Sequence, residues 1–386
     1  MKTKLLAGAA LAAATICGAV QAAEPVKIGM ITTLSGGGSS LGVDVRDGFL
    51  LAVEQEGGTL GGQAVEVLIE DDARKPEKAK SIATRFQKSD RVDIMTGIIW
   101  SNLAMAVVPQ VTRAGVFYVS PNAGPSALAG KGCHENYFNV AWQNDNLHEA
   151  MGEYMKAEGF KKPFILAPNY PAGKDSLTGF KRFYQGAPLA EVYTKLGQKD
   201  YAAEIAQIRA SGADSVFFFL PGGMGIAFLK QYGQSGVGLP VFGPAFSFDQ
   251  GILQAAGDAA LGVINTSQWN KDLDNAANKQ FVAAFQTKYG RLPSLYASQG
   301  YDAARLIASA LEAVGGEVSR AEDFRKALKA ADFESVRGDF AFGANHHPIQ
   351  DIYVRKVVRE APVLTNQTLG VALKDHRDAY AADCKL

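Results

Sequence analysis

Short apolar runs alternate with longer amphipathic stretches along most of the chain. Residues 26–33, VKIGMITT, form an apolar, β-rich run that predicts a buried strand. Residues 44–56 place Val45, Phe49 and Val53 four positions apart, which is the spacing of one helical face. The same patterns predict further strands at 64–70, 93–97, 116–120, 164–167, 189–193, 215–220, 241–243, 262–266 and 352–358, and further helices at 76–89, 102–114, 144–159, 173–184, 201–211, 224–233, 275–289, 295–314 and 321–330.

The order of these elements predicts the fold class. Repeated strand–helix units require parallel sheets that are covered by helices on both faces. The alternation begins near residue 26 and restarts after Ala141, so we predict an α/β protein with two doubly wound lobes. No low-complexity linker separates the two runs. We therefore expect the chain to cross between the lobes several times.

Residues 1–22 have the three parts of an export signal. Basic Lys2 and Lys4 precede an apolar stretch over 5–18, and Val20-Gln21-Ala22 is a small-residue cleavage site. No other stretch approaches the ~18 uncharged apolar residues of a membrane span. The expected product is a mature periplasmic protein, in an oxidising compartment.

Composition narrows the function classes. The chain has 386 residues, which exceeds one ordinary core and favours two domains. Its 39 basic and 39 acidic residues cancel, which gives no electrostatic case for binding nucleic acid or an anionic membrane. Downstream of the signal, the only cysteines are Cys133 and Cys384. Two cysteines exclude a disulfide-dense scaffold and a four-cysteine zinc site, and we expect no metal and no cofactor.

A glycine-rich loop, Ser35–Ser40, follows the first strand and precedes the first helix. A strand, a glycine loop and a helix N-terminus together form a site for an anion. The spacing does not fit a dinucleotide fingerprint, because Leu41 stands where the third glycine is required. In a doubly wound sheet the loops after the other strands line the same crevice. These loops are 100–102, 120–124, 168–170, 221–223, 245–246 and 267–269.

The content of these loops favours binding over catalysis. They carry amides, hydroxyls and large aromatic rings, which suit an organic anion with a flat apolar body, and no nucleophile–base pair is evident. His148-Glu149 lacks the second histidine of a zinc protease motif, and His346-His347 is expected to be a solvated loop pair. No G-x-S-x-G elbow occurs. An exported α/β hydrolase and a ligand-sensing domain stay open as alternatives from other function classes.

Five ordered motifs carry a resemblance that covers essentially the whole mature chain: KIGMITTLSG, GGQAVEVLIEDDARKPEKAKSIATRF, TGIIWSN, YVSPNAG and LPSLYASQGYDAA. Their order resembles the periplasmic branched-chain amino acid binding proteins of ABC transporters, and more closely the branch that binds aromatic acids. The resemblance implies two Rossmann-like lobes that close over a ligand, joined by a multi-crossing hinge, with an inner-membrane ABC permease as partner. It divides the chain into residues 24–142 plus 270–338 for one lobe and 143–269 plus 339–386 for the other. We expect a monomer.

The resemblance also implies a carboxylate clamp. The family serine after the fourth strand matches Ser101, and the backbone donors of the next loop match Asn122, Ala123 and Gly124. Amino acid binders usually have threonine at the last of these positions and glutamate where this chain has Ala245. Without that glutamate a buried ammonium would lose its charge-assisted partner. We therefore expect a small carboxylate, most specifically an aromatic acid of the benzoate or phenylpropenoate type. A branched-chain or other amino acid remains the alternative ligand.

Several candidate site residues have a second, structural interpretation. Ser101 and Asn102 open a predicted helix and could cap it. The aromatic candidates Phe246 and Trp269, like Trp100, could be core residues, and Tyr170 and Tyr296 could bond to backbone groups at strand ends.

Cys133 and Cys384 are expected to pair in a disulfide, because an exported chain has few reasons to keep two free thiols. The alternative is a buried thiol together with a thiol in a disordered tail.

Overall fold

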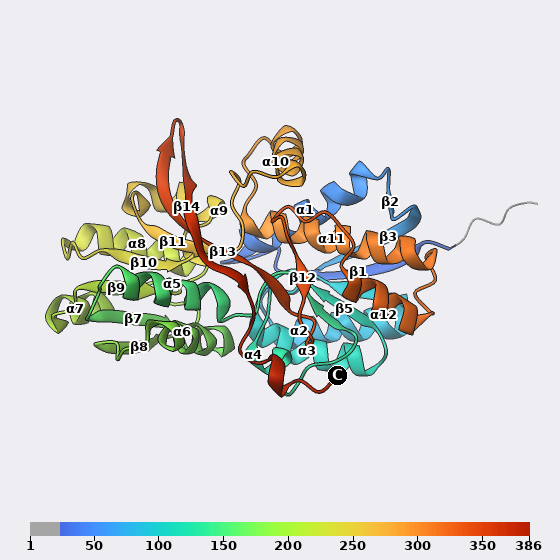
Figure 1. Cartoon of the computed structure of the whole chain (residues 1–386), viewed down its shortest axis with the longest axis horizontal. Helices are drawn as coiled ribbons and strands as arrows, with labels where there is room; N and C mark the ends of the chain where they lie inside the picture. The colour runs from blue at the N-terminus through green and yellow to red at the C-terminus, as the bar shows by residue number, and fades with distance from the viewer. Residues whose placement is uncertain (1–23) are drawn as a thin grey trace, which may run out of the picture.

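The computed structural model describes residues 24–386. The predicted signal peptide therefore lies outside the described residues. Two α/β lobes lie side by side, and the long strand β13 runs across the boundary between them (Figure 1). Both lobes have parallel strands at the centre, as the repeated strand–helix pattern predicts.

The first lobe is built on a six-stranded sheet in the order β2-β3-β1-β4-β5-β6. Its central strand β1 pairs in parallel with both β3 and β4, and all but one of its residues are buried. The strands are β1 (Val26–Thr32), β2 (Thr59–Leu60), β3 (Gln63–Asp71), β4 (Ile94–Thr96), β5 (Phe117–Ser120) and β6 (Tyr137–Asn139). The helices are α1 (Ser39–Gln55), α2 (Pro76–Arg85), α3 (Ser101–Arg113), α4 (Ser126–Ala129), α10 (Ala276–Tyr289), α11 (Leu295–Val314) and α12 (Ala321–Ala330).

The second lobe is built on an eight-stranded sheet, in which β12-β13-β11-β10-β9-β7-β8 form one path and β14 pairs with β13. Its strands are β7 (Pro163–Pro168), β8 (Ala190–Thr194), β9 (Ser215–Phe218), β10 (Val241–Pro244), β11 (Ile264–Ser267), β12 (Ala341–Phe342), β13 (Pro348–Glu360) and β14 (Val363–His376). Its helices are α5 (Asn146–Ala157), α6 (Pro171–Tyr184), α7 (Ala202–Ser211), α8 (Gly223–Ser235) and α9 (Gln250–Ala256).

The two lobes are in contact. The backbone amide of Leu295, at the start of α11, donates to both carboxylate oxygens of Asp249, at the start of α9, at 3.1 and 3.2 Å. Burial raises the pKa of the Asp249 carboxyl to about 7. The chain passes from the first lobe to the second after β6, returns after β11 and passes back before β12. The exact boundary residues given above remain a prediction.

The structure corrects several expectations from the sequence. The last predicted strand, 352–358, is part of the longer β13, which forms a hairpin with the unpredicted β14. Helix α9 was also not predicted, and α1 starts at Ser39, inside the expected glycine loop.

The expectation that His346 and His347 are solvated is wrong. Both are buried. The His346 ring stacks on Phe138 with centroids 4.1 Å apart, and the His347 ring lies edge-on to Tyr137. These contacts place the loop before β13 against β6.

Cys133 and Cys384 form a disulfide with Cα atoms 5.7 Å apart, which lies in the usual range for such pairs. The bridge joins the loop before β6 to the C-terminal segment. The expected pairing is therefore present in the structure.

Candidate functional site

A small cavity lies between the lobes, at the carboxyl ends of the parallel strands. Its volume is about 30 Å³, far below the roughly 300–1,000 Å³ of small-molecule sites, so the lobes or the lining rings must move apart before a ligand fits. The first lobe contributes residues of α1 and α11 and residues that follow β4, β5 and β6, and the second contributes Asn144, His148 of α5 and residues that follow β7, β9 and β10. The lining residues are Leu41, Ile99, Trp100, Ser101, Asn122, Ala123, Trp142, Asn144, His148, Tyr170, Ala172, Phe219, Pro221, Phe246 and Tyr296.

The N-terminus of α3 forms one polar part of the cavity wall. Helix α3 begins at Ser101, directly after the β4 end of the sheet, and its first turn contains no acidic residue. The amides of the first helical residues lack intrahelical acceptors, and the helix dipole adds partial positive charge there. The Ser101 Oγ accepts a hydrogen bond from Asn144 Nδ2 at 3.1 Å. This arrangement of hydroxyl, amides and dipole suits an anion.

The loop after β5 forms the neighbouring wall. Three donors hold the carbonyl oxygen of Ala123 in place: Ser120 Oγ at 2.8 Å, Tyr137 Oη at 3.0 Å and Asn139 Nδ2 at 3.0 Å. Asn122 Nδ2 donates to the Ile99 carbonyl at 2.6 Å, whereas Asn122 Oδ1 has no hydrogen-bond partner within residues 24–386. The loop is therefore rigid, with a free polar atom on a residue that lines the cavity.

Aromatic side chains make up most of the remaining wall. Trp142 and Phe246 lie with ring centroids 4.5 Å apart, and Tyr170 stacks on Phe219 at 6.3 Å. Burial raises the pKa of the Tyr296 hydroxyl well above its usual value, so this hydroxyl stays protonated. Flat rings around a small space favour a flat apolar ligand.

His148 is a neutral polar group in this aromatic wall. Burial lowers its pKa to about 3. Its ring lies edge-on to Phe219, with centroids 5.0 Å apart. Its Nδ1 atom has no hydrogen-bond partner in the described part of the chain. A neutral imidazole of this kind can donate to, or accept from, a polar group of a ligand.

The lining residues include no aspartate, glutamate, lysine or arginine. A cation lies behind the wall, where the Arg74 guanidinium is 4.6 Å from the centroid of the Trp100 ring and donates to the Gly37 carbonyl at 2.7 Å. The cavity thus offers hydrogen-bond donors, and none of the side chains that line it carries a charge.

Six of the nine predicted ligand residues line this cavity: Ser101, Asn122, Ala123, Tyr170, Phe246 and Tyr296. Asn102 is not among the lining residues. Gly124 is also not among the lining residues, and its amide already donates to Asn144 Oδ1 at 3.2 Å. Trp269 lies in the core, where its Nε1 donates to Asn278 Oδ1 at 2.7 Å and its ring packs edge-on to Phe281.

Sequence reasoning missed Trp142, Asn144 and His148 as lining residues. Trp142 and Asn144 follow β6, and the rule that ligands bind at strand ends is the signal that points to them. His148 lies in the first turn of α5, and neither its spacing nor its neighbours in the sequence mark it as a ligand residue. Among the described residues, no cluster of side chains is suited to hold a metal ion.

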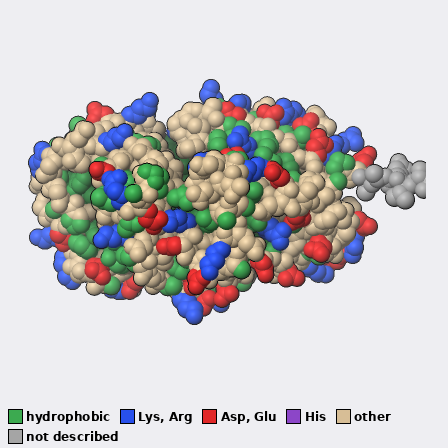
Figure 2. All heavy atoms as spheres, turned by 90° about the horizontal axis from the view of Figure 1, so that it is seen from above, with side chains coloured by type: hydrophobic (Ala, Val, Ile, Leu, Met, Phe, Trp, Pro, Cys, Tyr) green, Lys and Arg blue, Asp and Glu red, His purple; other side chains and the backbone are tan. Residues whose placement is uncertain are grey.

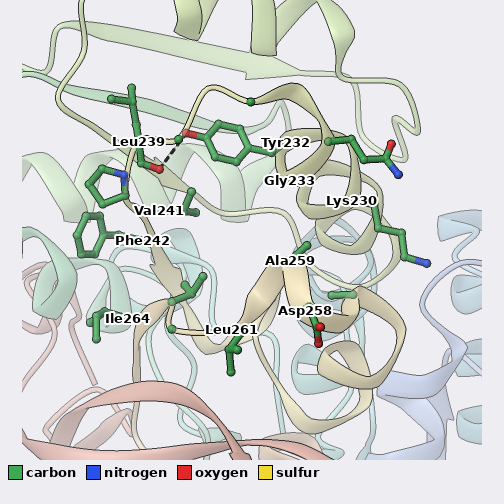
Figure 3. Close-up of a pocket in the computed structure, with 17 residues that line it drawn as sticks. Lys230, Tyr232, Gly233, Leu239, Val241, Phe242, Asp258, Ala259, Leu261 and Ile264 are labelled. Atoms are coloured by element: carbon green, nitrogen blue, oxygen red, sulfur yellow. Dashed lines mark hydrogen bonds between the residues drawn. The ribbon is translucent and has the colours of Figure 1, made fainter.

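A wider groove occurs at the opposite ends of β10 and β11 (Figure 3). It encloses about 920 Å³ and is open to solvent, with Tyr232 donating to the Leu239 carbonyl at 3.0 Å along its wall. Ligands of doubly wound sheets bind at the carboxyl ends of strands. The smaller cavity between the lobes, which has convergent polar groups, is therefore the better candidate site.

The face in Figure 2 carries charged side chains of both signs, which are mixed over both lobes. Within residues 24–386, none of the helices combines the length and the apolar content that a bilayer crossing requires.

Comparison with known proteins agrees with this geometry. A family model described as periplasmic binding protein matches residues 25–362. A Leu/Ile/Val-binding protein homologue from Brucella melitensis is 27% identical over 368 residues, covering 92% of this chain and 93% of its own.

Two solved structures from R. palustris are also similar to this chain. One is an ABC transporter solute-binding protein in complex with benzoate, with a TM-score of 0.90, 31% identity, and coverage of 94% of this chain and 100% of the other. The second, in complex with 4-hydroxybenzoate, has a TM-score of 0.86 and 27% identity, and covers 92% of this chain and 99% of its own. These relatives are binding proteins and not enzymes. The chain therefore belongs to the periplasmic binding protein family and is a solute-binding protein of the ABC transporter type.

Proposed function

We propose that the protein binds an aromatic carboxylate of the benzoate or phenylpropenoate type and delivers it to an ABC permease of the inner membrane. The observation that carries this proposal is the cavity itself, in which aromatic rings surround a small space beside the N-terminus of α3. The carboxylate would accept hydrogen bonds from Ser101 and the free helix amides, and the ring would lie among Trp142, Phe246 and Tyr170.

The absence of an acidic lining residue argues against an α-amino acid. A zwitterionic ligand would bury its ammonium beside rings and amides without a carboxylate partner. Loss of a charge-assisted bond together with the desolvation of an ion is costly. Ala245, where amino acid binders carry glutamate, is buried and does not line the cavity.

Relatives support both ligand classes to different degrees. The benzoate-bound neighbour has the higher identity and the fuller coverage, whereas the homologue from Brucella melitensis is named for leucine, isoleucine and valine. A branched-chain amino acid is therefore the second candidate ligand. We further propose that the mature protein is a periplasmic monomer, released by cleavage of the signal peptide.

Isothermal titration calorimetry with benzoate, 4-hydroxybenzoate, cinnamate and leucine tests the proposal. We expect one aromatic acid to bind at one site per chain, and leucine to bind at least about tenfold more weakly, a difference of about 1.4 kcal/mol. Tight leucine binding with no heat from the aromatic acids would overturn the aromatic assignment and support the second candidate.

A further inference from the structure

A chain of hydrogen bonds connects the two lobes beside the cavity. Ser126 begins α4 of the first lobe, and Asp175 lies on α6 of the second. The Ser126 amide donates to Asp175 Oδ2 at 3.0 Å, and the Ser126 hydroxyl donates to Asp175 Oδ1 at 2.7 Å. Asp175 is buried, and a buried carboxylate depends on such donors. The paired contact can exist only while the lobes are together.

Asn144 extends this chain of bonds to the cavity. Its Nδ2 atom donates to Asp175 Oδ2 at 2.9 Å and to Ser101 Oγ at 3.1 Å. Its Oδ1 atom accepts from the Gly124 amide at 3.2 Å. One side chain thus contacts the helix that faces the ligand and the loop after β5, both in the first lobe, and the Asp175 carboxylate of the second lobe. Ser126, Asn144 and Asp175 together are called the interlobe link below.

We propose that Asn144 and Asp175 are positioning residues that couple the occupied ligand site to lobe closure. The inference rests on the proposed function, because it places the ligand carboxylate at Ser101. With Ser101 held by the ligand, Asn144 is fixed between Ser101 and Asp175, and the bonds of Asp175 to Ser126 keep the lobes together. Opening then requires the loss of the two hydrogen bonds from Ser126 to the Asp175 carboxylate and of the bonds that join Asn144 to Ser101 and Gly124. In the open form water makes these hydrogen bonds instead, so the link stabilises only the closed, ligand-bound form. We therefore expect it to slow ligand release and to have little effect on ligand association.

Stopped-flow kinetics on the mature protein tests this inference, with benzoate as probe and the fluorescence of Trp100 and Trp142 as signal. The variants are Ser126→Ala, Asp175→Asn and the double variant, and Thr178→Ala, exposed on the same helix α6, is the matched control. We expect Asp175→Asn to raise koff about tenfold, equivalent to about 1.4 kcal/mol, with little change in kon. Ser126→Ala should also raise koff, and Thr178→Ala should leave it unchanged.

The double variant separates a direct link from general destabilisation. If Ser126 and Asp175 act as one pair, Ser126→Ala adds little to koff once Asp175→Asn is present. An unchanged koff in Asp175→Asn, or fully additive effects of the two substitutions, would overturn the inference.

Failure of the proposed function is distinguishable from failure of the link. If the wild type binds leucine and not benzoate, the ligand assignment fails, and the same variants are compared with leucine. Hydrogen exchange at the Ser126 amide in the ligand-bound chain gives an independent result. The amide should exchange faster in Asp175→Asn than in the wild type, and equal exchange rates would count against the link.

Discussion

At the residue scale, the position of a residue after a strand predicts only part of the site, because ligands of doubly wound sheets bind at the carboxyl ends of strands. Whether such a residue reaches the cavity also depends on its contacts with other elements, which the sequence does not contain. Ser101 and Ala123 follow buried strands, and both line the cavity. Trp269 also follows a strand, but an amide partner, Asn278, holds it in the core. A tryptophan after a strand end can turn toward the ligand or away from it. Only the neighbouring elements decide which of the two occurs.

Ser101→Ala tests the carboxylate position directly. The substitution removes a hydroxyl beside the N-terminus of α3 and leaves the backbone amides in place. A bond to a charged group contributes about 1.5–3 kcal/mol, so benzoate affinity should fall about 10- to 150-fold. Calorimetry measures the affinity, and thermal unfolding should change little. A variant that loses stability and keeps its affinity would show that Ser101 has a structural role only.

His148 gives a prediction about pH. Its pKa falls from about 6.5 in the unfolded chain to about 3 in the folded one. Between these values the unfolded state takes up a proton that the folded state does not, so stability is lost as the pH falls below 6.5. Relative to His148→Gln, the wild type should lose on the order of 3 kcal/mol between pH 7 and pH 4.

Urea denaturation of both proteins at several pH values measures this difference. Buried carboxyls with raised pKa values, such as Asp249, have the opposite pH dependence. Their effect cancels in the comparison because both proteins contain them. Parallel stability curves for the wild type and the variant would contradict a neutral buried His148.

At the element scale, the sequence predicted best those elements whose pattern is local and strong. Helix α11 was predicted with its observed bounds, since Ser294 caps its start, with its side chain accepting from the Ala297 amide, and Gly315 ends it. Strand β14 was not predicted: its one apolar run, LGVAL at 369–373, is short, lies between polar residues and is exposed or half-buried. Strand β14 forms because the chain turns back after β13 and pairs with it in an antiparallel hairpin, and the hydrophobic pattern of β14 alone does not predict this pairing.

The contact between α1 and α11 gives a prediction at this scale. A Cβ atom on Gly300 would lie 2.0 Å from the Val45 carbonyl oxygen, so the two helices approach through their backbones. Gly300→Ala should lower the free energy of unfolding by about 1–3 kcal/mol, because overpacking outweighs the helix propensity of alanine.

Gly251→Ala is the matched control for Gly300→Ala. Gly251 is exposed on α9, and a Cβ atom there meets nothing within 4 Å. This substitution should stabilise the protein by about 0.5–1 kcal/mol. Urea denaturation compares the two variants. Equal changes in both would show that α1 and α11 do not pack as tightly as the structure indicates.

At the scale of the whole molecule, the account requires that the lobes open and close. The cavity walls come from both lobes, so a ligand reaches the site only when the lobes separate. Small-angle scattering should give a smaller radius of gyration with saturating benzoate than without it. An unchanged radius would mean that ligand binding does not shift the lobes, and the hinge part of the account would be wrong.

The central claim is that an aromatic carboxylate occupies the cavity with its charge at the N-terminus of α3. A crystal structure of the complex with benzoate tests it most directly. We expect carboxylate oxygens within about 3 Å of Ser101 Oγ and of a backbone amide at the start of α3, with the ring between Trp142, Phe246 and Tyr170. A carboxylate that faces the second lobe, or benzoate bound outside this cavity, would contradict the claim.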